Sequence, residues 1–250
     1  MQSTLQKIRS RLFRKSSSNS LRSTTAESYA LISKLGFKPK TVIDVGVASG
    51  TEELYSAFPE ATLLLIEALN QFEPNLVSIL KRYRGSYLIA AAGAQTGEVT
   101  FNCHPEHLAG SSLYKESMGS EADGYEVTVP MVKLDEVIQA KQLSGPYLIK
   151  IDVQGAELDV LEGSRQTLLD TEVIALEVSL FEFMKGAPQF SDVIHYMKNL
   201  GFVPYDITLG WNRPLDNALG QVDMLFVKDK GMFRKNQSYS TVEQLKSLFP

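Results

Sequence analysis

Four apolar runs of this chain each end in, or next to, a carboxylate, and this pattern constrains the fold more than any other feature. The runs cover residues 41–46, 63–67, 148–152 and 173–177, and their acids are Asp44, Glu67, Asp152 and Glu177. In an open α/β sheet, ligands bind beyond the carboxyl ends of the parallel strands. Acids gathered at that edge predict a site for a cationic or hydroxyl-rich small molecule beside a nucleoside cofactor.

Helical patterns separate the strand runs from about residue 24 onward, which predicts an α/β fold around a mostly parallel sheet. We expect helices at residues 25–35, 51–58, 71–83, 134–142, 155–170 and 190–200, and further strands at 86–92, 202–207 and 222–227. The last two strands have no helix between them. That ending predicts a hairpin whose final strand runs antiparallel to the others.

The regular alternation breaks between residues 97 and 130. Two extra strand runs, at 98–101 and 125–130, enclose the polar segment 104–124, which has little periodicity. A long loop inside a compact domain is commonly functional or mobile. We interpret this inserted hairpin as a candidate lid over the site.

Length and composition favour one domain, at residues 24–250. The 250 residues are 44% hydrophobic, so a single domain can bury a substantial core. No apolar run reaches the roughly 18 residues of a membrane-spanning helix. The single cysteine, Cys103, excludes an intrachain disulfide framework and a cysteine-rich zinc site. These features fit a cytoplasmic location, and the sequence has no internal repeat and predicts no particular oligomeric state.

Charge is distributed unevenly along the chain. Residues 1–25 contain six basic and no acidic side chains, and the net charge of the whole chain is −4, so the remainder carries −10. An acidic body disfavours nucleic acid as a partner. Segment 1–23 is either a flexible basic tail or a short amphipathic helix at 4–15, and the second form would permit peripheral membrane contact.

The loop after the first strand has the composition of a cofactor loop. Gly46 and Gly50 allow close backbone approach to a ligand, and the next helix offers free N–H groups. Glu67, 21 residues after Gly46, could accept hydrogen bonds from two ribose hydroxyls. Ala48 replaces the middle glycine of the dinucleotide fingerprint, while Asp44 would repel phosphate and help to hold an ammonium group. S-adenosylmethionine therefore fits better than a dinucleotide.

Beyond these features, the sequence resembles the FkbM-type S-adenosylmethionine-dependent methyltransferases over roughly residues 40–228. The most distinctive segment is Ile149-Lys150-Ile151-Asp152-Val153-Gln154-Gly155-Ala156-Glu157. It continues through Val160-Leu161 and Gly163, and supporting residues lie at 42–46 with Gly50, 65–67, 91–93 with Gly97 and Phe101, 111–113, 132–135 and 221–227. The resemblance implies a Rossmann-like class I methyltransferase fold that transfers a methyl group to a hydroxyl, often on a sugar, glycan or secondary metabolite.

The resemblance also implies where the cofactor lies: its methionine portion at Gly46 and Gly50, its ribose at Glu67, and its adenine over Ala91 or Ala92. Two positions depart from the family pattern. Gln154 stands where the family commonly has glutamate, and Ala68 where it has proline. The first removes a charge beside the expected reacting centre, which puts the role of that position in doubt.

Methyl transfer to an alcohol needs alignment of the acceptor oxygen and benefits from a base. Asp152 is the first candidate, for the acceptor hydroxyl or the cofactor amine, because Lys150 on the same strand face could keep it ionised. The alternative is a purely structural ion pair. Glu177 is the expected partner of Asp152, and a purely structural role is again the alternative. His104 is a further catalytic candidate if the lid closes, although a role in the surface or in lid packing is the favoured interpretation.

Two further interpretations concern the same edge of the sheet. Ser111 could hydrogen-bond the substrate or the cofactor carboxylate, or be an ordinary loop serine. Asp152 and Glu177 offer oxygen ligands to a hard divalent cation, but no accompanying ligand motif supports them, and we predict no metal site.

The favoured function is therefore an S-adenosylmethionine-dependent O-methyltransferase acting on a small-molecule or glycan acceptor. Two other classes stay open at this point. One is a nucleotide-dependent oxidoreductase, which the missing middle glycine and the antiparallel ending disfavour. The other is a catalytically silent cofactor-binding module, for which Gln154 is the one sign.

Overall fold

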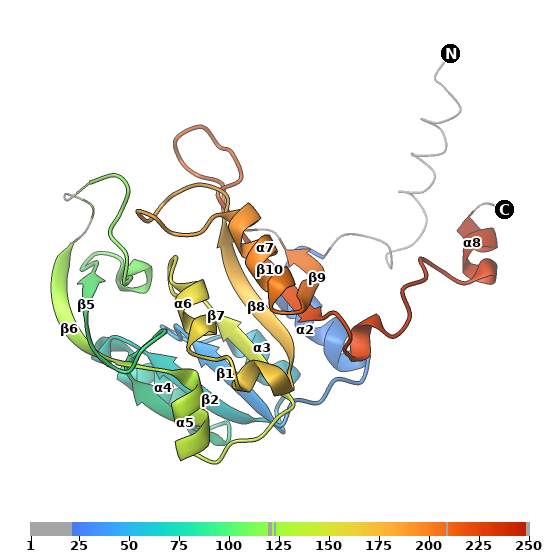
Figure 1. Ribbon diagram of the computed structural model, residues 1–250, viewed down its shortest axis with the longest axis horizontal. Coiled ribbons are helices and arrows are strands. Elements are labelled where there is room, and N and C mark those ends of the chain that lie inside the picture. Colours follow the sequence, from blue (N-terminus) through green and yellow to red (C-terminus); the bar gives the residue numbers. More distant parts are fainter. Residues whose placement is uncertain (1–21, 120–121, 123, 209, 249–250) are drawn as a thin grey trace.

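The computed structural model describes residues 22–119, 122, 124–208 and 210–248, and its centre is a seven-stranded sheet flanked by helices (Figure 1). The strand order is β3-β2-β1-β7-β8-β10-β9, and only β10 runs antiparallel to its neighbours. This arrangement confirms the predicted Rossmann-like sheet with an antiparallel last strand. The strands are β1 (Thr41–Val45), β2 (Thr62–Glu67), β3 (Gly85–Ile89), β7 (Tyr147–Ile151), β8 (Thr171–Ser179), β9 (Phe202–Thr208) and β10 (Gln221–Lys228).

Helices cover both faces of the sheet, which explains why its central strands are mostly apolar. Ile43 and Val45 of β1 face one layer, and Val42 faces the other. The first layer consists of α5 (Leu134–Ala140), α6 (Glu157–Glu162) and α7 (Phe190–Asn199). The second consists of α2 (Thr25–Lys34), α3 (Glu52–Ala57) and α4 (Glu73–Leu80).

The insertion predicted at 97–130 forms a second, three-stranded sheet of order β4-β6-β5. Its strands are β4 (Ala91–Ala92), β5 (Gly97–Cys103) and β6 (Tyr125–Val132), and β5 pairs with β6 antiparallel as the hairpin requires. The prediction of a single strand at 86–92 is wrong in one respect. Ala90 separates β3 from β4, and Ala91 pairs with Met131 of β6 instead of continuing the main sheet. The small sheet is therefore joined directly to the end of β3, through Ala90.

Two helix boundaries also differ from the sequence prediction. The helix expected at 155–170 is divided into α6 and a 3-10 turn, η3 (Thr167–Asp170). Asp135 of α5 causes this division, because its carboxylate accepts hydrogen bonds from the backbone N–H groups of Gln166 and Thr167. The helix α2 begins as expected, with Thr24 and Glu27 forming a capping box.

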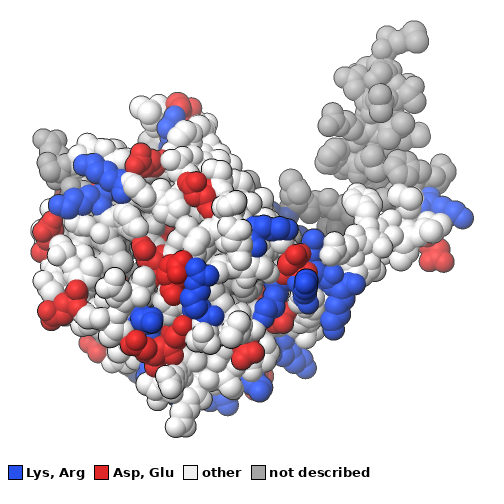
Figure 2. Space-filling model, in the orientation of Figure 1, with Lys and Arg blue, Asp and Glu red and all other residues white. Residues whose placement is uncertain are grey.

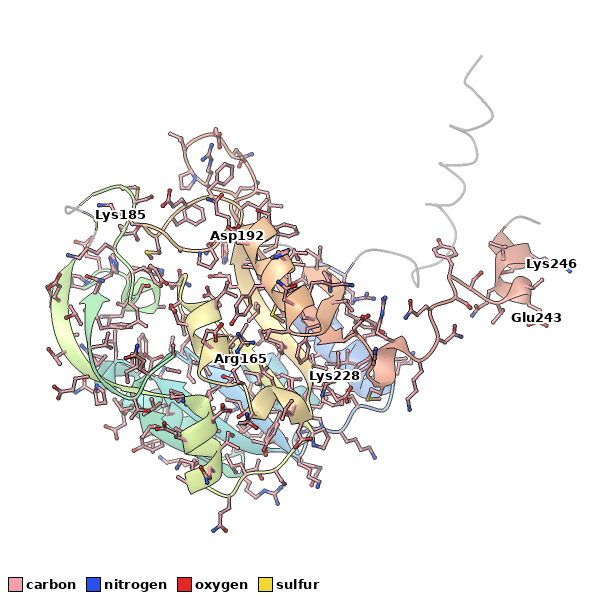
Figure 3. The ribbon with its side chains drawn as sticks, in the orientation of Figure 1. Arg165, Lys185, Asp192, Lys228, Glu243 and Lys246 are labelled. Atoms are coloured by element: carbon pink, nitrogen blue, oxygen red, sulfur yellow. The ribbon has the colours of Figure 1, made fainter. Side chains whose placement is uncertain are left out.

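The outer surface carries contacts that tie the helices together. Arg165 lies on the face of α6 and α7 (Figure 3), where it pairs with Glu162 at 2.6 Å and donates to Tyr196 Oη at 3.4 Å. The terminal helix α8 (Val242–Leu248) was not predicted and lies away from the sheet (Figure 1). Across the described ranges, no helix has the length and apolar character needed to cross a membrane. The predicted basic segment 1–23 lies outside the described residues except for its last two.

Truncating a buried leucine of the central sheet should destabilise the fold. Leu64 of β2 is 0% exposed, and Leu64→Ala is expected to lower the free energy of unfolding by about 2–5 kcal/mol through lost burial and the cavity left behind. The matched control is Leu215→Ala, because Leu215 is 83% exposed and should change stability by no more than about 0.5 kcal/mol. Urea denaturation followed by circular dichroism measures both, and equal stabilities would contradict this account of the core.

Candidate active site

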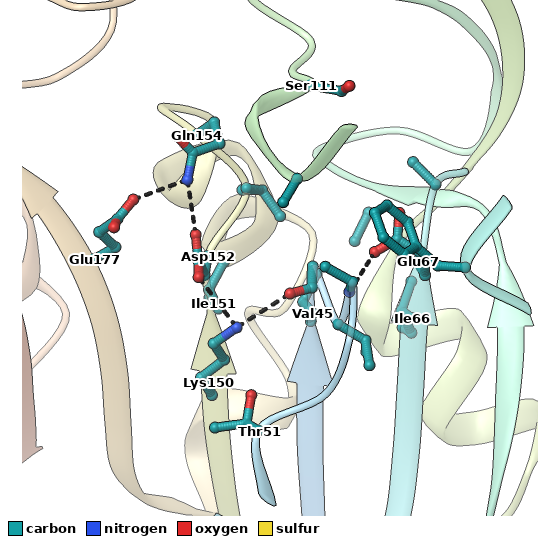
Figure 4. A pocket seen from close by; sticks show the side chains of 18 of the residues that line it. Val45, Thr51, Ile66, Glu67, Ser111, Lys150, Ile151, Asp152, Gln154 and Glu177 are labelled. Carbon is teal, nitrogen blue, oxygen red and sulfur yellow. Dashed lines mark hydrogen bonds and ion pairs between the residues drawn. The ribbon is translucent and has the colours of Figure 1, made fainter. Parts of the chain in front are cut away.

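A cavity of about 380 Å³ lies at the carboxyl ends of the central strands, between the main sheet and the insertion (Figure 4). It spans the ends of β2, β1, β7 and β8, which are three strand spacings or about 14 Å across. Its lining contains most of the residues selected from the sequence: Gly46, Gly50, Glu67, Ala91, Ala92, Ser111, Asp152 and Glu177. Asp44 and His104 do not line it.

The loop after β1 needs its glycines. Gly46 has a φ of +76°, and a Cβ built on it would lie 1.8 Å from the backbone oxygen of Asp152. The loop from β1 therefore packs backbone to backbone against the end of β7, which only glycine permits. Gly50, with a φ of +102°, would similarly bring a Cβ within 2.8 Å of the Ile79 side chain.

Glu67 lies at the β2 end of the cavity, with 6% of its surface exposed. Its Oε2 accepts from Ala48 N and its Oε1 from Leu69 N, both at 2.9 Å. Burial raises the pKa of Glu67, while the two backbone donors work against that rise. The carboxylate is thus held rigidly, and it connects the glycine loop to the turn after β2.

An apolar wall lies beside Glu67. Leu69 and Ala91 of the main fold pack with Phe101 of β5, and Leu113 of the insertion lies against the same cluster. All four residues line the cavity. This end of the cavity is therefore bounded by small, branched and aromatic apolar side chains.

A buried ammonium organises the middle of the site. Lys150 Nζ donates to Gly46 O at 3.0 Å and lies 3.3 Å from Asp152 Oδ2 (Figure 4). It also lies 3.4 Å from Asp44 Oδ1. Burial opposes the charged form, but Asp152 and Asp44 outweigh it and raise the pKa of Lys150. Asp44 is fully buried below the loop, where Tyr55 Oη also donates to it. Its contact with the cavity is therefore indirect, through Lys150 and the loop.

The β8 end of the cavity contains a chain of polar side chains. Gln154 Nε2 donates to Asp152 Oδ1 at 3.0 Å and to Glu177 Oε2 at 2.9 Å (Figure 4). Gln221 Nε2 donates to the same Glu177 oxygen at 3.0 Å. Burial, followed by the charges of Asp152 and two other acids, raises the pKa of Glu177 to about 9. Glu177 is therefore protonated at neutral pH, which disqualifies it as a general base there.

Glu157 keeps the neighbouring turn in place. Its Oε1 accepts from Val153 N and Gly155 N, both at 3.1 Å. Burial raises its pKa to about 7. Glu157 therefore serves the turn at the start of its own helix.

The insertion covers the cavity and is joined to the main domain. Ser112 Oγ donates to the backbone oxygen of Gln154 at 2.7 Å, and Tyr114 Oη donates to Asp159 of α6 at 2.8 Å. Further along, Glu116 and Met184 form an antiparallel bridge. The segment expected to act as a lid is thus docked above the carboxylates.

The histidine and serine side chains of the insertion differ in whether they line the cavity. Ser111 lines the cavity, and its Oγ accepts from His104 N at 3.0 Å. The His104 ring lies outside the lining, whereas His107 lines the cavity. Among the described residues, no group of three or more histidine, cysteine or acidic side chains is arranged to hold a metal ion.

Several residues of the lining were not selected from the sequence as site residues. Asp223 and Glu53 join the acidic end, and Phe101 and Leu113 form the apolar wall. Phe101, Leu113 and Asp223 fall within segments that carry the family resemblance, so that signal could have identified them. Glu53, on α3, had no comparable signal in the sequence.

Comparison with known proteins places this geometry in a family. Residues 44–204 match the methyltransferase FkbM domain. The hexuronic acid methyltransferase AglP of Haloferax volcanii is 24% identical over 113 residues, which cover 43% of this chain and 45% of that protein. The matched segment therefore spans less than half of that relative.

Among solved structures, magnesium protoporphyrin IX methyltransferase from Synechocystis PCC 6803 aligns with a TM-score of 0.46 at 10% identity, covering 90% of this chain and 92% of that one. A putative rRNA methylase from Clostridium thermocellum gives the same TM-score and identity, with 84% and 97% covered. The match over residues 44–204, rather than these alignments, identifies the family.

The burial of Asp223 should be visible in the pH dependence of stability. Burial and the charge of Asp152 raise the pKa of Asp223 from its ordinary 3.8 to about 6, so ionisation is harder in the folded state than in the unfolded chain. The resulting stabilisation is complete below about pH 4 and is lost as pH rises through 6. Asp223→Asn removes this loss. The free energy of unfolding of the variant should therefore exceed that of the wild type by about 1–3 kcal/mol at pH 8, and the difference should be smaller at pH 4.

Thermal denaturation at pH 4 and pH 8 measures this gap. The control is Asp229→Asn in the turn after β10, which should follow the wild type at both values. A gap for Asp223→Asn that is the same at both pH values would contradict the assignment.

Proposed function

The chain belongs to the FkbM methyltransferase family, and on that premise we propose that it transfers the methyl group of S-adenosylmethionine to a hydroxyl of a sugar or glycan. The observation that supports this most directly is the single cavity with two unlike ends. One end offers a fixed carboxylate beside an apolar wall, and the other offers linked carboxyl groups.

The β2 end suits the nucleoside. Glu67 has both oxygens directed by backbone donors, so its remaining lone pairs can accept from vicinal ribose hydroxyls. Ala91 and Ala92 leave room for a ring, and Phe101 bounds it. Gly46 and Gly50 let the loop approach the methionine portion. When bound, the cofactor supplies a methyl group on a positively charged sulfur.

The β8 end suits the acceptor. Asp152 lies at the end of β7, within the lining and beside the glycine loop, and it is the residue to accept the proton of the reacting hydroxyl. Glu177, protonated at neutral pH, can donate a hydrogen bond to a second hydroxyl of the same acceptor. The docked insertion limits water above both groups, which favours transfer over hydrolysis.

A polyhydroxylated acceptor agrees better with these groups than nucleic acid does. The reacting end contains acids, whereas phosphate tracking requires clustered lysine and arginine. Figure 2 shows basic and acidic side chains interspersed over most of the visible face. The relative AglP, described as a hexuronic acid methyltransferase, supports a sugar acceptor.

Loss of the Glu67 carboxylate should weaken cofactor binding. Glu67→Gln replaces two acceptor oxygens by one acceptor and one donor, so affinity for S-adenosylhomocysteine is expected to fall by about 10- to 100-fold. Isothermal titration calorimetry measures the dissociation constants. The exposed Glu60→Gln is the matched control and should bind like the wild type. Unchanged affinity in Glu67→Gln would overturn the placement of the ribose.

Methyl transfer itself should depend on Asp152. Wild-type protein with tritiated S-adenosylmethionine is expected to label p-nitrophenyl glucuronide or p-nitrophenyl glucoside, and Asp152→Asn should lower kcat by about 100-fold or more. The control is Asp170→Asn, an exposed substitution. Binding of the cofactor without labelling of any hydroxylated acceptor would favour the catalytically silent alternative.

A further inference from the structure

We propose that Gln154 is the positioning residue of the acceptor end, a neutral amide that holds Asp152 and Glu177 in one fixed arrangement. This inference rests on the proposed function, because it concerns how the two carboxyl groups are presented to the acceptor. Gln154 lines the cavity between them, at the turn that joins β7 to α6.

The first observation is the use of the amide nitrogen. A primary amide has two N–H donors, and Gln154 directs one to Asp152 at 3.0 Å and the other to Glu177 at 2.9 Å. Both donors are engaged with carboxyl groups of the site.

The second observation is the backbone of the same residue. Gln154 has a φ of +54°, in the left-handed region that glycine adopts more readily. Gly155 follows with a φ of +101°, so the chain does use glycine at the adjoining position. This backbone conformation turns the chain between β7 and α6 and accompanies the placement of the Gln154 side chain between the two carboxyl groups.

The third observation connects this turn to the insertion. Ser112, fully buried, donates from Oγ to the backbone oxygen of Gln154 at 2.7 Å, and Oγ accepts from Tyr114 N at 3.0 Å. The turn is therefore fixed from above by the insertion and from below by Glu157. Gln154 transmits that fixed position to both carboxyl groups.

A glutamate at position 154 could not make the same contacts. As a carboxylate it has no donor, and when protonated it has one, so it can donate to Asp152 or to Glu177 but not to both, and a second contact would require the proton of Glu177 itself. A glutamate carboxylate would also add a charge to the group of titratable residues around position 154. That group consists of Lys150, Asp152, Glu177 and Asp223, with Glu157 from α6 and His107 from the insertion. The amide supplies both hydrogen bonds at every pH.

Two substitutions test this role without requiring turnover. Gln154→Met keeps the length of the side chain but removes both hydrogen-bond donors. Gln154→Glu keeps the shape of the side chain, but the number of its hydrogen-bond donors depends on pH. In protein without cofactor, carboxyl carbons labelled with carbon-13 report the titration of Glu177 by NMR, with Glu177→Gln identifying its signal. Loss of a donor to the carboxylate should raise the apparent pKa of Glu177 by about 1 in both variants. Gln139→Glu, on the exposed surface of α5, is the control and should leave it unchanged.

Turnover provides the second readout. With the p-nitrophenyl glycoside that the wild type methylates, Gln154→Met should lower kcat by about 10- to 100-fold at all pH values, as a displaced reacting group does. The ratio of kcat for Gln154→Glu to that of the wild type should fall as pH rises from 6 to 9, because the added carboxyl loses its only donor. Affinity for S-adenosylhomocysteine should stay within about twofold of the wild type, since the β2 end is untouched.

An unchanged titration of Glu177 in both variants would overturn the proposal, as would a kcat ratio for Gln154→Glu that is constant from pH 6 to 9. A wild-type protein that fails to bind S-adenosylhomocysteine would instead overturn the proposed function. The titration of Glu177 would then still decide whether Gln154 positions the two carboxyl groups.

Discussion

The buried ammonium of Lys150 is the interaction on which the site depends. It joins Asp44 below the glycine loop, Gly46 within it and Asp152 at the cavity surface. A lysine with 13% of its side chain exposed is costly to bury unless its charge is compensated, and here two carboxylates and a carbonyl do so. Replacing Lys150 by a neutral residue would leave the buried Asp44 carboxylate without its cation, so this one side chain ties the loop to the reacting end.

From this centre, the two ends of the cavity acquire different characters. Toward β2 the polar atoms belong mainly to backbone and to Glu67, and the remaining surface is apolar. Toward β8 the surface is acidic, and burial changes which acids are ionised. With a pKa of about 9, Glu177 is a donor, while Asp223, with a pKa of about 6, is mostly a carboxylate at neutral pH. Two chemically similar side chains on adjacent strands therefore serve different roles.

The insertion completes the site by a short set of contacts. Its small sheet begins at Ala91, immediately after the main sheet ends, so the apolar wall and the first contacts of the insertion come from one continuous segment. Ser112 then returns the chain to Gln154. The position of the insertion above the cavity follows from these two attachments, one before its first strand and one between β5 and β6.

The sequence by itself determined the sheet, the order of its acids and the glycine loop, because strand periodicity and the carboxyl-end rule depend only on local pattern. It identified Glu67 and Asp152 at the cavity for the same reason. Only the tertiary structure decided that Asp44 lies beneath the loop, that Glu177 is protonated and that His104 lies outside the lining. It also placed the amide of Gln154, a departure from the family pattern, within hydrogen-bond distance of both Asp152 and Glu177. Burial, charge coupling and hydrogen-bond partners arise between segments distant in the chain, and no local pattern encodes them.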